Sequence, residues 1–246
     1  MSLNLKNHPF AVEAFFKYSI VLTFAVPKEQ LYSLLPTPLR AETYNDQWGF
    51  IAVSMVDTQH LRPKGFPAFM GNSFFLIGYR IFVQYTNQKG KRLRGLYILK
   101  SQTNKKKMEL LGNIFTHYNY STTDIIQIQQ EKFIRISSNQ SDIKLSIQEP
   151  ETTISLPASS PFPDWNIDRR YAGPLPFTFT KISDKQILII EGVRSKWIPQ
   201  PVEVREYSFG FLDQLPFSNY HLANAFIIRN IPYHWKKGVI EHVKSL

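Results

Sequence analysis

Alternating apolar side chains are the feature that most constrains how this sequence can fold. Over residues 73–85 one set of alternate positions is wholly apolar: Phe75, Ile77, Tyr79, Ile81, Val83 and Tyr85. This period of two predicts a β-strand with one face against a core. Further strands are predicted at residues 18–26, 48–56, 93–101, 113–120, 125–128, 133–137, 143–148, 177–182, 187–193 and 202–212. Many short strands without a strand–helix rhythm predict a mainly β protein, either an antiparallel barrel or a sandwich.

Helix signals are few and short. We expect helices at residues 28–35, at residues 104–111 with Asn104 as the cap, and at residues 218–229 with Ser218 as the cap. The proline-rich stretch 156–176 is typical of a long surface loop or an internal junction. A chain of 246 residues can bury one large core, so we treat 1–246 as a single domain.

The positive charge of the chain is confined to one segment. Residues 58–108 contain eleven Lys and Arg side chains and no Asp or Glu, whereas the rest of the chain has 18 basic and 19 acidic residues. A segment with this bias produces a field that attracts anions. It favours a small anionic ligand. The alternatives are a nucleic-acid surface, although no nucleic-acid-binding module is recognisable, and an interface between copies of the chain or a solvated rim.

Several classes of protein are disfavoured by what the sequence lacks. It contains no cysteine, and its first residues lack the pattern of a signal peptide. The apolar run 14–26 is too short to span a bilayer and contains Lys17. We therefore expect a cytoplasmic protein that does not enter membranes.

Phosphate-loop, nucleophile-elbow and zinc-protease motifs are also missing. His234 and His242 are eight residues apart and could share one helix face, but a surface helix explains this spacing without a metal. We expect neither a metal nor a cofactor.

Arg80 is the first candidate for ligand binding. It lies on the second face of the 73–85 strand, among Phe74, Leu76, Gly78 and Phe82. If this face lines a barrel interior, Arg80 would hold an anion with its planar guanidinium, and Gly78 would leave room beside it. Alternatively, Arg80 pairs with a carboxylate such as Glu203 or extends to solvent from the outside of the barrel.

The next strand offers two further basic candidates. Arg94 and Lys100 fall on one face of residues 93–101, and Lys100 follows four apolar residues. An amine in apolar surroundings can lose its charge and act as a nucleophile. The alternative is a lysine at the end of a strand that reaches solvent.

Residues 116–120 form the densest polar group. Thr116, His117, Tyr118 and Tyr120 supply hydrogen-bonding side chains, and His117 could act as an acid or base near neutral pH. A buried histidine with satisfied hydrogen bonds is the alternative. Neighbours on a strand point to opposite faces, so His117 and Tyr118 cannot both face one lumen unless a bulge intervenes.

Several short segments share a pattern with a known family: residues 8–14, 48–50, 61–64, 76–80, 94–97 and 111–118, and more thinly residues 197–202. In these segments the chain resembles an uncharacterised bacterial family, the YqjF-like branch of the acetoacetate-decarboxylase-like superfamily. The resemblance implies a large, mainly antiparallel, cone-like β-barrel with a few short helices and a small-molecule site inside.

The resemblance also indicates what this chain lacks. In the decarboxylases a glycine is followed closely by Pro-Lys-Lys, and one lysine forms a Schiff base with the keto acid. Here Gly112 is followed by Asn-Ile-Phe-Thr-His, and the lysines at 105–107 precede the glycine. Tyr79 and Arg80 stand near the position at which the decarboxylases carry a carboxylate.

The sequence thus predicts a barrel that binds a small organic anion, a carboxylate or keto acid. Arg80, Arg94, Thr116, Tyr120 and Glu203 are the candidate ligand-binding residues. If the protein is an enzyme, His117, Tyr118 and Lys100 are the candidate catalytic residues. The activity would then be lyase- or hydrolase-like, without standard acetoacetate decarboxylation.

Overall fold

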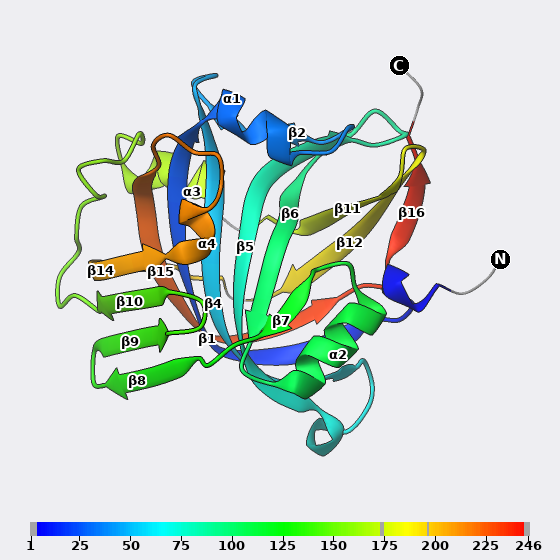
Figure 1. Cartoon of the computed structure of the whole chain (residues 1–246), viewed down its shortest axis with the longest axis horizontal. Coiled ribbons are helices and arrows are strands. Elements are labelled where there is room, and N and C mark those ends of the chain that lie inside the picture. Colours follow the sequence, from blue (N-terminus) through cyan, green and yellow to red (C-terminus); the bar gives the residue numbers. More distant parts are fainter. Residues whose placement is uncertain (1–3, 173–174, 196, 244–246) are drawn as a thin grey trace.

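A computed structural model describes residues 4–172, 175–195 and 197–243. Most of this chain is β-structure, as predicted, in a large sheet of twelve strands and a small sheet of four. The large sheet curls around a central space, and the small sheet lies against one side of it (Figure 1). No helix in this described part of the chain is both long and apolar enough to cross a membrane.

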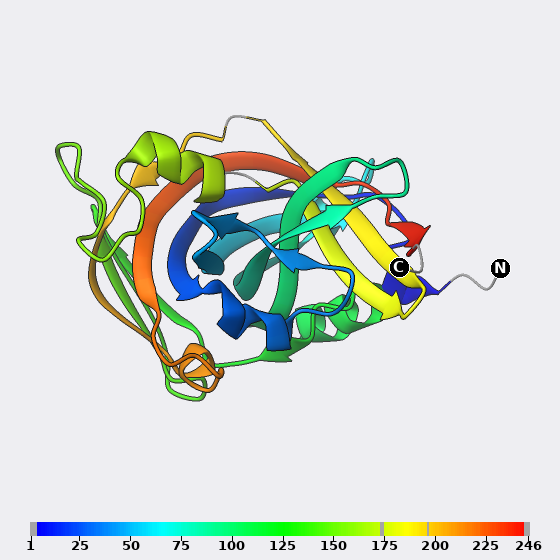
Figure 2. The same ribbon diagram turned by 90° about the horizontal axis from the view of Figure 1, so that it is seen from above.

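Seven strands of the large sheet close into a ring. The hydrogen-bonded order is β15–β1–β4–β5–β6–β11–β12, and β12 pairs again with β15. The view from above shows these strands curving around the interior (Figure 2). All neighbours in the ring are antiparallel except β6 and β11, which are parallel. The seven strands are β1 (Val12–Pro27), β4 (Trp48–Pro63), β5 (Asn72–Thr86), β6 (Arg92–Thr103), β11 (Phe177–Ser183), β12 (Gln186–Arg194) and β15 (His221–Trp235).

Shorter elements complete the two sheets. Five short strands extend the large sheet: β2 (Arg40–Ala41), β3 (Thr43–Tyr44), β7 (Tyr120–Thr122), β13 (Gln200–Pro201) and β16 (Val239–His242). The small sheet has the order β14–β10–β9–β8, with β8 (Ile126–Gln130), β9 (Phe133–Ser138), β10 (Ile143–Gln148) and β14 (Glu203–Phe209). The helices are α1 (Lys28–Leu31), α2 (Lys106–Phe115), α3 (Trp165–Ala172) and α4 (Gly210–Asp213), with short 3-10 turns at Leu5–Asn7, Tyr32–Leu34 and Ala68–Met70.

The long strands are buried on both faces, which explains their almost continuously apolar sequences. One face of β1, β4 and β5 packs against the small sheet, whose Ile134, Ile136 and Leu145 belong to the same apolar cluster. The six alternating residues of β5 named above all lie in this cluster, as predicted. The opposite face of these strands is therefore free to line the interior of the ring.

The predicted secondary structure is wrong in several places, including the end of the 202–212 strand, where Gly210–Asp213 forms α4. Residues 113–120 do not form one strand, because α2 continues to Phe115 and the next strand begins only at Tyr120. Gly112 lies inside the helix, where a Cβ would meet the Tyr120 ring at 2.3 Å. Asn104 does not cap this helix, because its side chain accepts a hydrogen bond from the Phe75 amide (2.9 Å).

The predicted helix at 218–229 is also wrong, since this segment enters β15, which pairs with β1 over its length. His234 and His242 accordingly lie on two different strands, β15 and β16, and do not share a helix face. Within residues 4–172, 175–195 and 197–243 no group of three or more potential metal ligands is found. The proline-rich stretch 156–176 contains α3.

Candidate functional site

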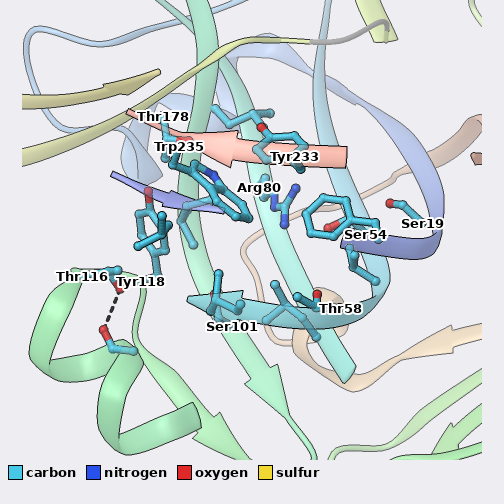
Figure 3. A pocket seen from close by; sticks show the side chains of 18 of the residues that line it. Ser19, Ser54, Thr58, Arg80, Ser101, Thr116, Tyr118, Thr178, Tyr233 and Trp235 are labelled. Atoms are coloured by element: carbon cyan, nitrogen blue, oxygen red, sulfur yellow. Dashed lines mark hydrogen bonds between the residues drawn. The ribbon is translucent and has the colours of Figure 1, made fainter. Parts of the chain in front are cut away.

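A cavity of about 430 Å³ lies inside the ring. Its walls come from β1, β4, β5, β6, β11, β12 and β15, and α2 with the segment that follows it forms a further wall. Apolar side chains make up most of the lining, as in many small-molecule sites. The polar groups gather around Arg80, which stands near the centre of the close-up view (Figure 3).

Arg80 points into this cavity from β5, as the alternation of the strand predicts. A Cβ on Gly78 would lie only 3.0 Å from Nε and Nη2 of Arg80, so the guanidinium rests over the glycine. The buried Nε has no hydrogen-bond partner among the described residues. Burial lowers the pKa of Arg80, the hydroxyl groups of Tyr233, Tyr120 and Tyr118 raise it, and Arg194 lowers it. An arginine keeps its charge at neutral pH despite such a shift.

Arg194 brings a second guanidinium to the same cavity. It lies at the end of β12, donates a hydrogen bond to the Tyr233 hydroxyl (3.3 Å) and stacks 4.4 Å from the centre of the Trp197 ring. Burial lowers the pKa of Arg194, while Tyr233 raises it. Two half-buried guanidinium groups therefore share one space with hydroxyl groups as polar neighbours.

Carboxylates and lysines are both missing from the described residues that line the cavity. An unpaired buried charge is costly, and an anion that enters the cavity would offset this cost. The charged side chains among the described lining residues are therefore all basic, and these residues offer neither a carboxylate nor a lysine amine.

Tyr118 and Tyr120 supply hydroxyl groups beside Arg80. Both line the cavity, and burial raises the pKa of Tyr120 to about 12 and that of Tyr118 further. Each phenol is thus a neutral hydrogen-bond donor at physiological pH. The Tyr118 hydroxyl has no hydrogen-bond partner among the described residues. It points towards Thr178 (Figure 3).

Thr116 fixes the chain that carries these tyrosines. Its hydroxyl donates to the Gly112 carbonyl at the end of α2 (2.8 Å) and accepts from the Tyr118 amide (3.3 Å). Thr116 lines the cavity, but its hydroxyl is already used in these two bonds. We therefore assign it a positioning role.

His117 lies outside the cavity lining, in contrast to the sequence expectation. Its Nε2 is 3.0 Å from Oδ1 of Asn7, and burial together with Lys6 lowers its pKa. In the irregular segment between α2 and β7, Tyr118 faces the cavity, whereas His117 contacts Asn7. We correct the expectation that His117 takes part in chemistry at the Arg80 site.

Lys100 is excluded from the lining by a change of register. Tyr79 pairs with Lys100 but Arg80 pairs with Ile98, so Leu99 is an extra residue in β6. This bulge keeps Ile98 and Ser101 in the cavity and turns Lys100 to the opposite face. There its ammonium lies 4.9 Å from the centre of the Phe211 ring.

Arg94 and Glu203 also lie away from the site. Arg94 pairs with Glu42 (2.9 Å), and Glu203 pairs with Arg205 (2.9 Å) in the small sheet. Glu203 is therefore not the partner of Arg80. Of the eight predicted site residues, the cavity brings together Arg80, Thr116, Tyr118 and Tyr120.

Among the cavity residues that were not predicted as site residues are His8, Arg194 and Tyr233. Arg194 and Tyr233 reach the site only through the β12–β15 pairing, which closes the ring and leaves no local signal in the sequence. His8 is buried, and burial lowers its pKa to about 4. Its position in the 8–14 segment, which carries part of the family resemblance, is the one sequence signal that could have indicated it.

The basic segment 58–108 does not form one continuous charged surface. Arg62 pairs with Glu13 (2.8 Å), and Arg92 and Arg94 both pair with Glu42. Arg80 lies in the cavity and Lys100 packs against an aromatic ring. Four of the eleven basic side chains of this segment are thus paired with a carboxylate or directed into the cavity.

Comparison with protein families agrees with this architecture. Residues 15–236 match DUF2071, described as "Uncharacterized conserved protein (COG2071)". The chain belongs to this family. No protein of the curated set matches the sequence.

Solved structures with the same fold are distant in sequence from this DUF2071 member. Acetoacetate decarboxylase from Legionella pneumophila has a TM-score of 0.61 at 8% identity, covering 96% of this chain and 88% of that chain. An acetoacetate decarboxylase-like enzyme from Sphingomonas wittichii RW1 has a TM-score of 0.59 at 11% identity, covering 98% and 96%. The enduracididine biosynthesis enzyme MppR, complexed with pyruvate, has a TM-score of 0.59 at 7% identity, covering 94% and 90%. These likenesses establish an acetoacetate-decarboxylase-like fold.

Proposed function

We propose that the cavity binds a small organic anion, a carboxylate or keto acid, with Arg80 as its anchor. The observation that carries the proposal is the unpaired state of Arg80. Arg80 is half-buried, its buried Nε has no partner among the described residues, and no described lining residue carries a negative charge. A carboxylate would accept two parallel hydrogen bonds from such a group.

The surroundings of Arg80 support the same assignment. Neutral phenols at Tyr118 and Tyr120 can donate to an anion, and Arg194 adds a second positive charge to the cavity. A protein of this fold, MppR, has been crystallised with the keto acid pyruvate. That ligand belongs to MppR, but it is consistent with the kind of molecule proposed here.

The proposal concerns binding and includes no Schiff-base step. The described cavity lining contains no lysine, and Lys100 lies on the other face of its strand. Among the described lining residues, the phenols and His8 are the titratable groups besides arginine.

Isothermal titration with pyruvate, acetoacetate and butanoate tests the proposal. We expect saturable binding to the wild type and a loss of about 10- to 100-fold in affinity for Arg80→Met, because a charge-assisted hydrogen bond is removed. Arg135→Met is the matched control, since Arg135 is exposed on the small sheet and its loss removes the same charge. Equal binding by both variants, or no binding of any of these acids to the wild type, would disprove it.

A further inference from the structure

The polarity and free space of the cavity differ on the two sides of Arg80, and this difference indicates the size and polarity of its ligand. The guanidinium rests over Gly78, which pairs with Ser54 on one side and Ser101 on the other. Both serines line the cavity (Figure 3). This level of the barrel, with Tyr118 and Tyr120 beside it, is the polar part of the site.

From this polar level towards α2 the wall becomes mainly apolar, although Arg62 and Asn72 line its far end. The next lining pair along β4 and β5 is Val56 and Leu76, followed by Thr58 and Phe74. Met108 and Leu111 of α2 complete the lining at this end. The ring of Phe16, which packs against Tyr233 at 4.9 Å, faces the same space from β1.

In the opposite direction from Arg80 the ring is closely filled. Phe82 packs against Phe50, with ring centres 6.1 Å apart, and Phe50 stacks on Phe162 at 5.1 Å. Tyr171 stacks on Phe162 in turn at 5.7 Å. A ligand held by Arg80 therefore has its free space mainly on the α2 side.

The length of the apolar compartment sets the size of the ligand. Gly78 and Phe74 are four positions apart on β5, which corresponds to about 13 Å at ~3.3 Å per residue. A fully extended chain covers at most about 3.6 Å for every three bonds, so this length holds about ten carbon atoms. The volume of about 430 Å³ is much larger than pyruvate requires.

Resting on the proposed function of the same cavity, we propose that its ligand is an amphipathic organic acid. The carboxylate binds at Arg80, and an apolar body of about eight to ten carbons extends between β4 and β5 to α2. The apolar wall makes the main contribution to affinity, and Arg80 determines the orientation of the ligand.

Titration with straight-chain carboxylates from butanoate to dodecanoate tests this inference. We expect affinity to rise about fourfold for each added methylene until the chain has about ten carbons, and then to level off. Decan-1-ol, which has the same tail without the charge, should bind more weakly than decanoate. Affinity that does not change with chain length would overturn the inference, although loss of butanoate binding in Arg80→Met would still support the proposed function.

Leu76→Trp blocks the compartment without altering the polar level. This variant should weaken decanoate binding at least tenfold more than butanoate binding, and Val56→Phe should act in the same direction if Leu76→Trp folds poorly. Ile126→Trp is the matched control, because Ile126 is exposed on β8 of the small sheet. Unchanged decanoate binding in both blocking variants would place the apolar body elsewhere and overturn the inference.

Discussion

Gly78 and Arg80 are two residues apart on β5, and the absence of a side chain at Gly78 is what allows the Arg80 guanidinium to lie flat against the strand. A Cβ at position 78 would come within 3.0 Å of Nε and Nη2 and within 3.4 Å of Cζ. The glycine therefore positions the cation at the level of Ser54 and Ser101, where it faces the open part of the cavity.

Gly78→Val should displace the guanidinium without a backbone penalty, because β5 is extended and a β-branched residue suits a strand. We expect about a tenfold loss of carboxylate affinity, equivalent to about one hydrogen bond. Calorimetric titration with butanoate measures the loss, and thermal unfolding should show a change of only a few degrees. Wild-type affinity in this variant would show that the position of Arg80 over Gly78 does not matter for binding.

Lys100→Met tests whether a residue on the face of β6 opposite the cavity contributes to ligand binding. The ammonium of Lys100 lies over the Phe211 ring, so its loss should destabilise the protein by about 1 kcal/mol at most. Affinity for pyruvate, butanoate and decanoate should remain at the wild-type value in the same titrations. A large fall in affinity would mean that Lys100 reaches the ligand.

Asp168 should make the protein less stable as the pH rises. Burial raises the pKa of Asp168 to about 7, although hydrogen bonding from Asn224 and the charge of Arg169 act against this. The unfolded chain ionises near the ordinary value of 3.8, whereas the folded chain keeps the proton up to about pH 7. Stability is thus lost between these two pH values, by on the order of 1.4 kcal/mol per pH unit.

Asp168→Asn removes this dependence and retains an acceptor for Asn224. Urea unfolding at pH 5, 6 and 7 should show that the free energy of unfolding of the variant increases relative to that of the wild type as the pH rises. A constant difference across the three pH values would contradict a raised pKa at Asp168.

His8 should make the protein less stable as the pH falls, the opposite of the effect of Asp168. Burial lowers the pKa of His8 to about 4, so the folded chain keeps this ring neutral while the unfolded chain takes up a proton near pH 6.5. Stability is complete above about pH 6.5 and falls as the pH decreases towards 4. His8→Gln should lose less stability than the wild type between pH 7 and pH 5. The ring chemical shifts of His8 provide an independent measurement, and protonation near pH 6.5 would contradict the account.

The face of β5 that carries Arg80 could be predicted from the sequence alone, because the alternation of side chains along a strand is a local property. Phe74, Leu76 and Phe82 line the cavity with Arg80, and the other face packs into the core. Strand alternation did not predict which of His117 and Tyr118 faces the cavity, because residues 116–119 lie between α2 and β7 and are not part of a strand.

Other parts of the site depend on contacts between distant segments. The bulge at Leu99, which turns Lys100 away, arises from the pairing of β5 with β6 and has no signature in the apolar run around it. Gly112 resembles a helix end in the sequence, but close packing against Tyr120 explains a glycine within α2. Arg194 enters the cavity because β12 pairs with β15, more than 30 residues later in the chain.

A crystal structure with decanoate bound measures the central claim most directly. The account predicts that the carboxylate lies within hydrogen-bond distance of the Arg80 guanidinium and that the chain runs past Leu76 and Phe74 towards α2. A carboxylate located elsewhere, with Arg80 still unpaired or turned out of the cavity, would contradict it.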